Sequence, residues 1–146
     1  MQRSNAETRL VGSPSPNGRE RTASDVKSRS ILIVEDDQDL REALSEVLRD
    51  EGYSVAGAAD GREALDRLRR DPRPSLILLD LTMPVMNGWQ FRAEQREDPI
   101  LSRIPVVVLS AGDHLLEEMV PLGIENYVNK PIELGQLLRT IERCCS

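Results

Sequence analysis

The sequence predicts an α/β domain built around a parallel β-sheet. Short apolar runs rich in β-branched residues alternate with segments of helical apolar spacing, five of each, from residue 30 onward. Runs of this length and composition are typical of strands that are buried on both faces. Strands and helices that alternate in this way favour a parallel sheet with right-handed crossovers. The 146 residues are enough for one such domain.

Five apolar runs are the predicted strands. In chain order they are ILIV (31–34), YSVAGA (53–58), LILL (76–79), PVVVL (105–109) and NYV (126–128). In an open parallel sheet, ligands bind outside the carboxyl ends of the strands. The residues that follow these runs are therefore the first candidates for a functional site.

Three of the predicted helices carry apolar stripes. The stripes consist of Leu40, Leu44, Val47 and Leu48, of Ala64, Leu65 and Leu68, and of Leu134, Leu137, Leu138, Ile141 and Cys144. Asp60 and Gly61 are expected to precede the second of these helices. Cys144 lies beside Cys145 near the end of the sequence, and its place in a stripe indicates a core residue rather than a redox or metal site.

The remaining two helices have weaker patterns. The segment WQFRAEQRE (89–97) offers few apolar positions for a third helix. The fourth, DHLLEEMV (113–120), is followed directly by Pro121. A proline inside a helix removes a hydrogen bond and clashes with the preceding turn. We therefore expect the fourth helix to be short and to end near Val120.

Residues 1–29 differ in composition from the rest of the chain. They carry six basic and three acidic side chains and are rich in Ser, Pro, Gly and Asn, whereas the remainder has a net charge of -9. Such a segment cannot bury enough apolar surface to offset its ordering entropy, so we predict a disordered basic tail before a domain at 30–146. The acidic domain argues against nucleic-acid binding. No apolar run suits a membrane span or a secretory signal, and we expect a cytoplasmic protein with no membrane contact.

Charged and hydroxyl side chains follow four of the predicted strands. They are Glu35, Asp36 and Asp37 after the first strand, Asp80 after the third, Ser110 after the fourth, and Lys130 with Pro131 after the fifth. Each has an ordinary structural explanation when it is taken singly. Asp37 or Asp39 could cap the first helix, Ser110 could cap the fourth, and Lys130 could be a solvated charge.

Taken together, these side chains favour a phosphoryl site. Carboxylates gathered at one edge of a sheet repel one another, and each raises the pKa of the others unless a cation lies between them. Hard oxygen ligands with room for water are what Mg²⁺ prefers. The lysine and the hydroxyl then need an anion to face. A phosphoryl group held between Mg²⁺ and Lys130 would use every member of the set.

The same residues resemble the receiver domain of two-component response regulators, in particular the stand-alone, CheY-like kind. The matching stretches are ILIVEDD (31–37), LILLDLTMPVMNG (76–88), PVVVLSA (105–111) and YVNKP (127–131). Their order and spacing carry the resemblance over residues 30–146. It implies a flavodoxin-like fold, which is a doubly wound sheet in the order 2-1-3-4-5 flanked by five helices.

The resemblance also implies a role for each acidic residue of the site. Asp80 would be the phosphoacceptor and would also contact the metal. Asp36 would be a direct Mg²⁺ ligand, and Glu35 would hold the metal through water. The backbone carbonyl of Thr82 would complete the protein's share of the coordination sphere.

Four further residues receive roles from the same resemblance. Lys130 would pair with the phosphoryl oxygens, and the Lys130–Pro131 peptide bond would be cis. Ser110 would move to hydrogen-bond the phosphoryl group, and Tyr127 would turn inward behind it. Ser110 and Tyr127 would thus form the switch.

The implied function is that of a single-domain response regulator. An ionised Asp80 would attack the phosphorus of a phosphohistidine on a histidine kinase or a histidine phosphotransfer protein. Phosphorylation-dependent contacts would then carry the signal to an unidentified downstream protein. We expect no output domain, because the predicted fifth helix ends the sequence. The chain would not be an enzyme for other substrates, since it would catalyse only its own phosphorylation and dephosphorylation.

Two alternatives remain open. A pseudo-receiver would fold but would never be phosphorylated, and it would serve as a docking module; the complete set of Asp36, Asp80, Ser110 and Lys130 argues against it. A phosphohydrolase of the haloacid dehalogenase type also uses an aspartate after an apolar strand. That family wants a second aspartate two residues later, where this chain has Thr82.

Overall fold

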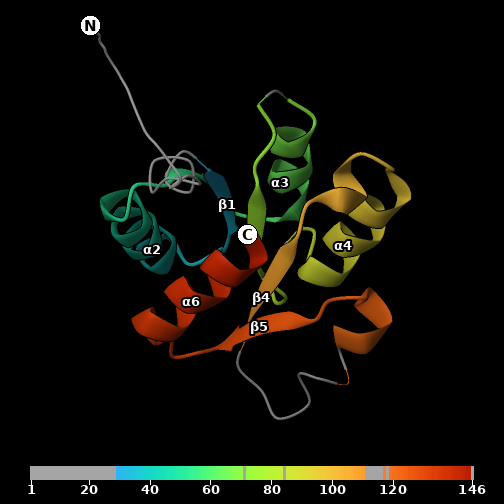
Figure 1. Ribbon diagram of the computed structural model, residues 1–146. Helices are drawn as coiled ribbons and strands as arrows, with labels where there is room; N and C mark the ends of the chain where they lie inside the picture. Colours follow the sequence, from blue (N-terminus) through green and yellow to red (C-terminus); the bar gives the residue numbers. More distant parts are fainter. Residues whose placement is uncertain (1–28, 71, 84, 111–116, 118, 146) are drawn as a thin grey trace, which may run out of the picture.

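The chain folds around one five-stranded parallel sheet in the order β2-β1-β3-β4-β5 (Figure 1). The computed structural model describes residues 29–145 except 71, 84, 111–116 and 118. The strands are β1 (Ser30–Val34), β2 (Ser54–Ala58), β3 (Leu76–Asp80), β4 (Val106–Ser110) and β5 (Asn126–Asn129). Each strand overlaps one of the predicted apolar runs. The predicted fold class and strand order are therefore confirmed.

Four α-helices lie within the described residues. They are α2 (Gln38–Asp50), α3 (Gly61–Leu68), α4 (Gly88–Glu97) and α6 (Leu134–Cys145), and two short 3-10 helices, η1 (Leu101–Arg103) and η2 (Val120–Leu122), accompany them. The sequence predicts five. Most of the segment 113–120, where the fourth was expected, lies outside the described residues. Met119 is still α-helical and η2 begins at Val120, in agreement with the end predicted there.

The helices cover both faces of the sheet and bury two apolar clusters (Figure 1). Helices α3 and α4 pack on the face that carries Leu32, Ile77 and Val108. Helices α2 and α6 pack on the opposite face, where alternate strand residues such as Ile33 and Leu78 point. Because the inner strands β1 and β3 are almost wholly buried on both faces, their sequences read as unbroken apolar runs.

Side-chain caps fix where the helices begin. Asp37 caps α2 by accepting a hydrogen bond from the Leu40 backbone N–H. Asp60 caps α3 in the same way, so Gly61 is the first residue of that helix and does not precede it as predicted. Since the cap satisfies a backbone donor that the helix itself leaves free, the helix can start directly after an aspartate.

Helix α4 is regular despite its few apolar positions. Its start is a capping box of Asn87 and Gln90, and its buried side includes Phe91 and Gln95. The Gln95 amide donates to the backbone carbonyls of Leu101 and Ile104, at 2.8 and 3.1 Å. A buried amide with satisfied hydrogen bonds thus replaces an apolar residue in the stripe.

At the end of α6 the core cysteine is Cys145, not Cys144 as predicted. Cys145 is buried and Cys144 is half-buried at the margin of the same cluster. Both thiols are free. No helix among the described residues is long and apolar enough to cross a membrane. The basic tail predicted at residues 1–29 lies outside the described residues, apart from Arg29.

Candidate functional site

The strand register brings the predicted acidic residues together at the carboxyl edge of the sheet. Val34 of β1 lies opposite Leu79 of β3, so the next residues along the two strands, Glu35 and Asp80, are neighbours. The sequence predicted that Asp80 would be the first residue after this strand. In the structure, Asp80 is instead the last residue of β3. Both carboxylates are buried, with exposed fractions of 1% for Glu35 and 5% for Asp80. Asp36, the next residue along, is exposed.

Lys130 reaches this pair from the far side of β4. Its Nζ donates to Glu35 Oε1 at 2.9 Å and lies 3.7 Å from Asp80 Oδ1. The Lys130–Pro131 peptide bond is cis, the geometry that the resemblance implied. The ammonium is therefore shared between the two buried carboxylates and is closer to Glu35.

Backbone donors hold the two buried carboxylates in place. The Asp37 N–H donates to Glu35 Oε2 and the Thr82 N–H donates to Asp80 Oδ1, each at 3.2 Å. Both oxygens of Glu35 thus have donors. Hydrogen bonds of this kind fix the orientation of a carboxylate before any ligand arrives.

Burial and charge change the acidity of the nucleophile candidate. Burial, followed by the charge of Glu35, raises the pKa of Asp80 from 3.8 to about 7, although Lys130 and the Thr82 N–H oppose the rise. The metal-free site therefore favours the protonated form of Asp80 more than water does, and the ionised Asp80 predicted for the Mg²⁺-bound site stays a prediction. A nearby cation lowers the pKa of a carboxyl group.

The lysine keeps its charge. Burial by itself lowers the pKa of Lys130, but the hydrogen bond to Glu35 and the charges of Asp80 and Asp36 outweigh burial, and the net change is a rise. Lys130 therefore presents a permanent ammonium to the site at neutral pH.

The three carboxylates fit a divalent cation. Glu35, Asp36 and Asp80 each offer an oxygen, and these oxygens lie within 4.8 Å of one another. Carboxylate oxygens with access to water are the donors that Mg²⁺ prefers, and the exposed side of Asp36 leaves room for water. Asp36 and Asp80 would hold the ion. Glu35, whose two oxygens already accept hydrogen bonds, would act through water.

The remaining predicted residues are placed by the backbone. Ser110 ends β4 opposite Asn129, which precedes Lys130, so its backbone lies at the same sheet edge. Tyr127 of β5 is half-buried and packs against the cluster under α3 and α4. Exposed Thr82 follows β3 at the site. The roles expected of Ser110, Tyr127 and the Thr82 carbonyl stay predictions.

One residue at the site was not predicted from the sequence. The Arg41 guanidinium, from the first turns of α2, donates to the backbone carbonyl of Glu35 at 2.6 Å. The signal that could have found it is a basic residue one turn into the helix that follows the acidic stretch. That this side chain crosses Gly57 of the neighbouring strand is seen only in the structure.

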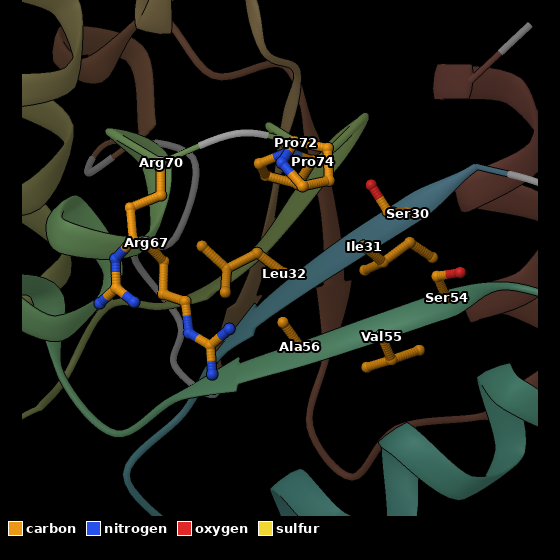
Figure 2. Close-up of a pocket in the computed structure, with 10 residues that line it drawn as sticks. All are labelled: Ser30, Ile31, Leu32, Ser54, Val55, Ala56, Arg67, Arg70, Pro72 and Pro74. Carbon is orange, nitrogen blue, oxygen red and sulfur yellow. The ribbon is translucent and has the colours of Figure 1, made fainter.

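A cavity of about 310 Å³ lies at the other end of the sheet (Figure 2). It is lined by the first residues of β1 and β2, by Arg67 of α3 and Arg70 just beyond that helix, and by Pro72 and Pro74. Asp80, at the opposite end of β3, does not line it. The predicted site residues thus lie at the carboxyl edge of the sheet and not in this cavity.

Comparison with known proteins decides the family. A family model described as the response regulator receiver domain matches residues 31–142. The chain belongs to the response regulator receiver domain family. The match covers the sheet except Ser30, the four described α-helices except the end of α6, and every residue of the candidate site.

Named relatives of this receiver domain are response regulators. The chain is 40% identical over 110 residues to response regulator MprA of Mycolicibacterium vanbaalenii. This match covers 74% of this chain and 46% of MprA. It is 38% identical over 119 residues to the DNA-binding response regulator MtrA of Mycolicibacterium smegmatis, covering 80% of this chain and 50% of MtrA. The chain spans about half the length of these curated relatives.

The receiver fold also matches solved structures. The chemotaxis response regulator CheY4 of Vibrio cholerae has a TM-score of 0.74 and 32% identity, and the match covers 80% of this chain and 98% of CheY4. The matched region of this chain is therefore similar to CheY4 over nearly the whole length of CheY4.

Proposed function

We propose that this receiver domain accepts a phosphoryl group on Asp80 from a phosphohistidine of a histidine kinase or a histidine phosphotransfer protein. The observation that supports the proposal most directly is the placement of a buried Asp80 between Glu35, Lys130 and Asp36 at the carboxyl edge of the sheet. That set offers a nucleophile, cation ligands and a fixed positive charge within one small site.

The residues divide the work of phosphoryl transfer. An Asp80 carboxylate oxygen forms a bond to phosphorus while the bond from phosphorus to the donor imidazole nitrogen breaks, and the imidazole keeps that electron pair and takes a proton from solvent. The Thr82 N–H holds Asp80 Oδ1 and orients the carboxylate. The Lys130 ammonium, 3.7 Å from Asp80 Oδ1, is placed to meet the negative oxygens of the transferred group.

A bound Mg²⁺ would supply charge neutralisation for the transferring group. Asp36 and Asp80 would hold it, with Glu35 acting through water and the Thr82 carbonyl as a further ligand. Because a cation lowers the pKa of a neighbouring carboxyl group, the same site would keep Asp80 ionised when the metal is present.

Signalling would follow as a shift between two packings of the domain. A phosphoryl group on Asp80 adds negative charge beside Ser110 and Lys130, and Tyr127 lies on the strand that leads to Lys130. The output is a change in contacts with a downstream protein. The name "DNA-binding" belongs to MtrA, which is about twice as long as the matched region. That this chain binds no nucleic acid, acts alone and is cytoplasmic remains our proposal.

Incorporation of phosphate from acetyl phosphate tests the proposal. Purified protein is incubated with acetyl phosphate and Mg²⁺, and intact mass is compared with that of Asp80→Asn and with a sample that contains chelator. One phosphoryl group on the wild type, and none on the other two samples, is the expected result. No incorporation by the wild type would favour the docking module, and rapid turnover of varied phosphate esters would favour the hydrolase.

A further inference from the structure

The acidic stretch at the end of β1 is held by an arginine from the following helix. The Glu35 N–H donates to the Ala58 carbonyl of β2 at 3.0 Å. On the other side of the residue, the Glu35 carbonyl accepts from Arg41 Nη1 at 2.6 Å. The Arg41 backbone N–H in turn donates to the Asp37 carbonyl at 2.9 Å. One residue therefore contacts both ends of the segment that contains Asp36.

The peptide group that Arg41 binds is the one that leads into Asp36. The Glu35 carbonyl belongs to the planar Glu35–Asp36 peptide unit, so a hydrogen bond to its oxygen restrains the rotation of that plane. Asp36 is exposed, and its carboxylate takes its position from this backbone. A charge-assisted hydrogen bond of 2.6 Å is of the short, strong kind.

Gly57 provides the path for the arginine side chain. A Cβ at Gly57 would lie 3.0 Å from Arg41 Cδ and 3.4 Å from Arg41 Cγ and Nε. Gly57 lies in the edge strand β2, and its φ is not among the positive values. The backbone therefore accepts any L-residue other than proline there. What a side chain would displace is Arg41.

We propose that Arg41, lying across Gly57, is a positioning residue that sets the Glu35–Asp36 peptide plane and thereby the affinity of the acidic site for a divalent cation. This inference rests on the proposed function, because it concerns the same metal site. Positioning and charge act in opposite directions here. The positive charge of Arg41 repels a cation, so its removal by charge alone would strengthen binding. Loss of positioning would weaken it.

Arg49 offers a matched control on the same helix. Its Nη2 donates to the Val55 carbonyl of β2 at 3.1 Å, two residues before Gly57 in the same strand. Arg49 thus ties α2 to the edge strand as Arg41 ties it to β1, without touching the acidic stretch. A purely structural role for these arginines would make the two alanine variants behave alike.

The experiment measures Mn²⁺ binding by electron paramagnetic resonance for the wild type, Arg41→Ala, Gly57→Val, the double variant and Arg49→Ala. Unfolding in urea is measured on the same samples. Residues that orient metal ligands typically change affinity by 10- to 100-fold, so we expect about a tenfold weaker affinity for Arg41→Ala. Gly57→Val keeps the arginine charge and should weaken binding in the same direction.

The double variant decides whether the two residues act as one unit. We expect its affinity to equal that of Arg41→Ala, because the valine can displace only an arginine that is present. Arg49→Ala should bind Mn²⁺ with an affinity within about twofold of the wild type. Its unfolding free energy should nevertheless fall by about as much as that of Arg41→Ala. If Gly57→Val does not fold, Gly57→Ala takes its place with a smaller effect of the same sign, since its Cβ alone meets Arg41 Cδ at 3.0 Å.

Several results would overturn the inference. Wild-type or tighter Mn²⁺ affinity in Arg41→Ala would show that Arg41 does not strengthen the metal site by positioning it. Independent losses in the double variant, or an equal loss in Arg49→Ala, would also contradict it. A wild type that binds no Mn²⁺, or binds it as well after Asp36→Asn, would instead contradict the proposed metal site itself.

Discussion

Replacing Asp80 with asparagine should stabilise the metal-free protein at alkaline pH. The Asp80 carboxyl is buried beside Glu35, and its pKa is raised from 3.8 to about 7. A folded-state pKa above the unfolded value means that folding favours the protonated form. The stability from this group is fully present below about pH 4 and is lost as the pH rises to about 7. Asparagine removes the charge that causes this loss.

The magnitude follows from the size of the rise. Three pKa units correspond to about 4 kcal/mol, which is an upper limit for the gain. Asparagine is still a buried polar group, and it gives up the attraction of Lys130 at 3.7 Å, so part of that gain is not realised. We therefore expect Asp80→Asn to raise the unfolding free energy by about 1–3 kcal/mol at pH 8 and by almost nothing near pH 4.

Urea unfolding in the presence of chelator, at pH 8 and at pH 4, is the assay. Asp66→Asn is the control, because Asp66 is an exposed aspartate on α3 and should change stability by no more than about 0.5 kcal/mol at either pH. Added Mg²⁺ should narrow the difference between wild type and Asp80→Asn, since it would bind the wild type more tightly. An Asp80→Asn protein that is no more stable than the wild type at pH 8 would refute the reasoning.

Three further substitutions test the surroundings of Asp80 by the same urea assay. Lys130→Met leaves Glu35 buried at 1% exposure without its ammonium, and should lower the unfolding free energy by about 2 kcal/mol at pH 8; an unchanged value would mean that the ion pair contributes nothing net. Val85→Gly should raise stability by about 0.5–1 kcal/mol, because Val85 holds φ at 66° with 78% of its surface exposed; a loss would show that the valine makes contacts that offset the strain. Gly88→Ala should cost at least about 2 kcal/mol, because the new Cβ would lie 2.8 Å from the Asp80 carbonyl oxygen, and a cost below 0.5 kcal/mol would show that α4 can move away freely.

The strands and the site edge were predictable because both depend on patterns that are local in sequence. A strand buried on both faces must be apolar throughout, and the carboxyl ends of parallel strands meet at one edge. The sequence alone therefore predicted that Glu35, Asp80 and Lys130 lie close together. The start of α3 was predicted to within one residue, because its cap, Asp60, is also a signal that is local in sequence.

The features that were missed depend on specific side-chain contacts and not on the spacing of apolar residues. Gln95 is buried because two carbonyls of the following turn accept its amide hydrogens, which an apolar pattern does not register. The choice of Cys145 over Cys144 depends on how the last turn of α6 meets the sheet. Arg41 reaches the Glu35 carbonyl because Gly57, in another strand, leaves room for its side chain. Lys130 lies closer to Glu35 than to Asp80, at 2.9 and 3.7 Å, and a difference this small is set by the folded structure.

The most direct test of the central claim is to locate the phosphoryl group. Borohydride reduces an acyl phosphate to an alcohol, so an aspartyl phosphate is converted to homoserine. After incubation with acetyl phosphate and Mg²⁺, we predict homoserine at position 80 in the peptide that spans β3, and at no other aspartate. Incorporated phosphate without homoserine at position 80, or homoserine at Asp36 in its place, would contradict the account.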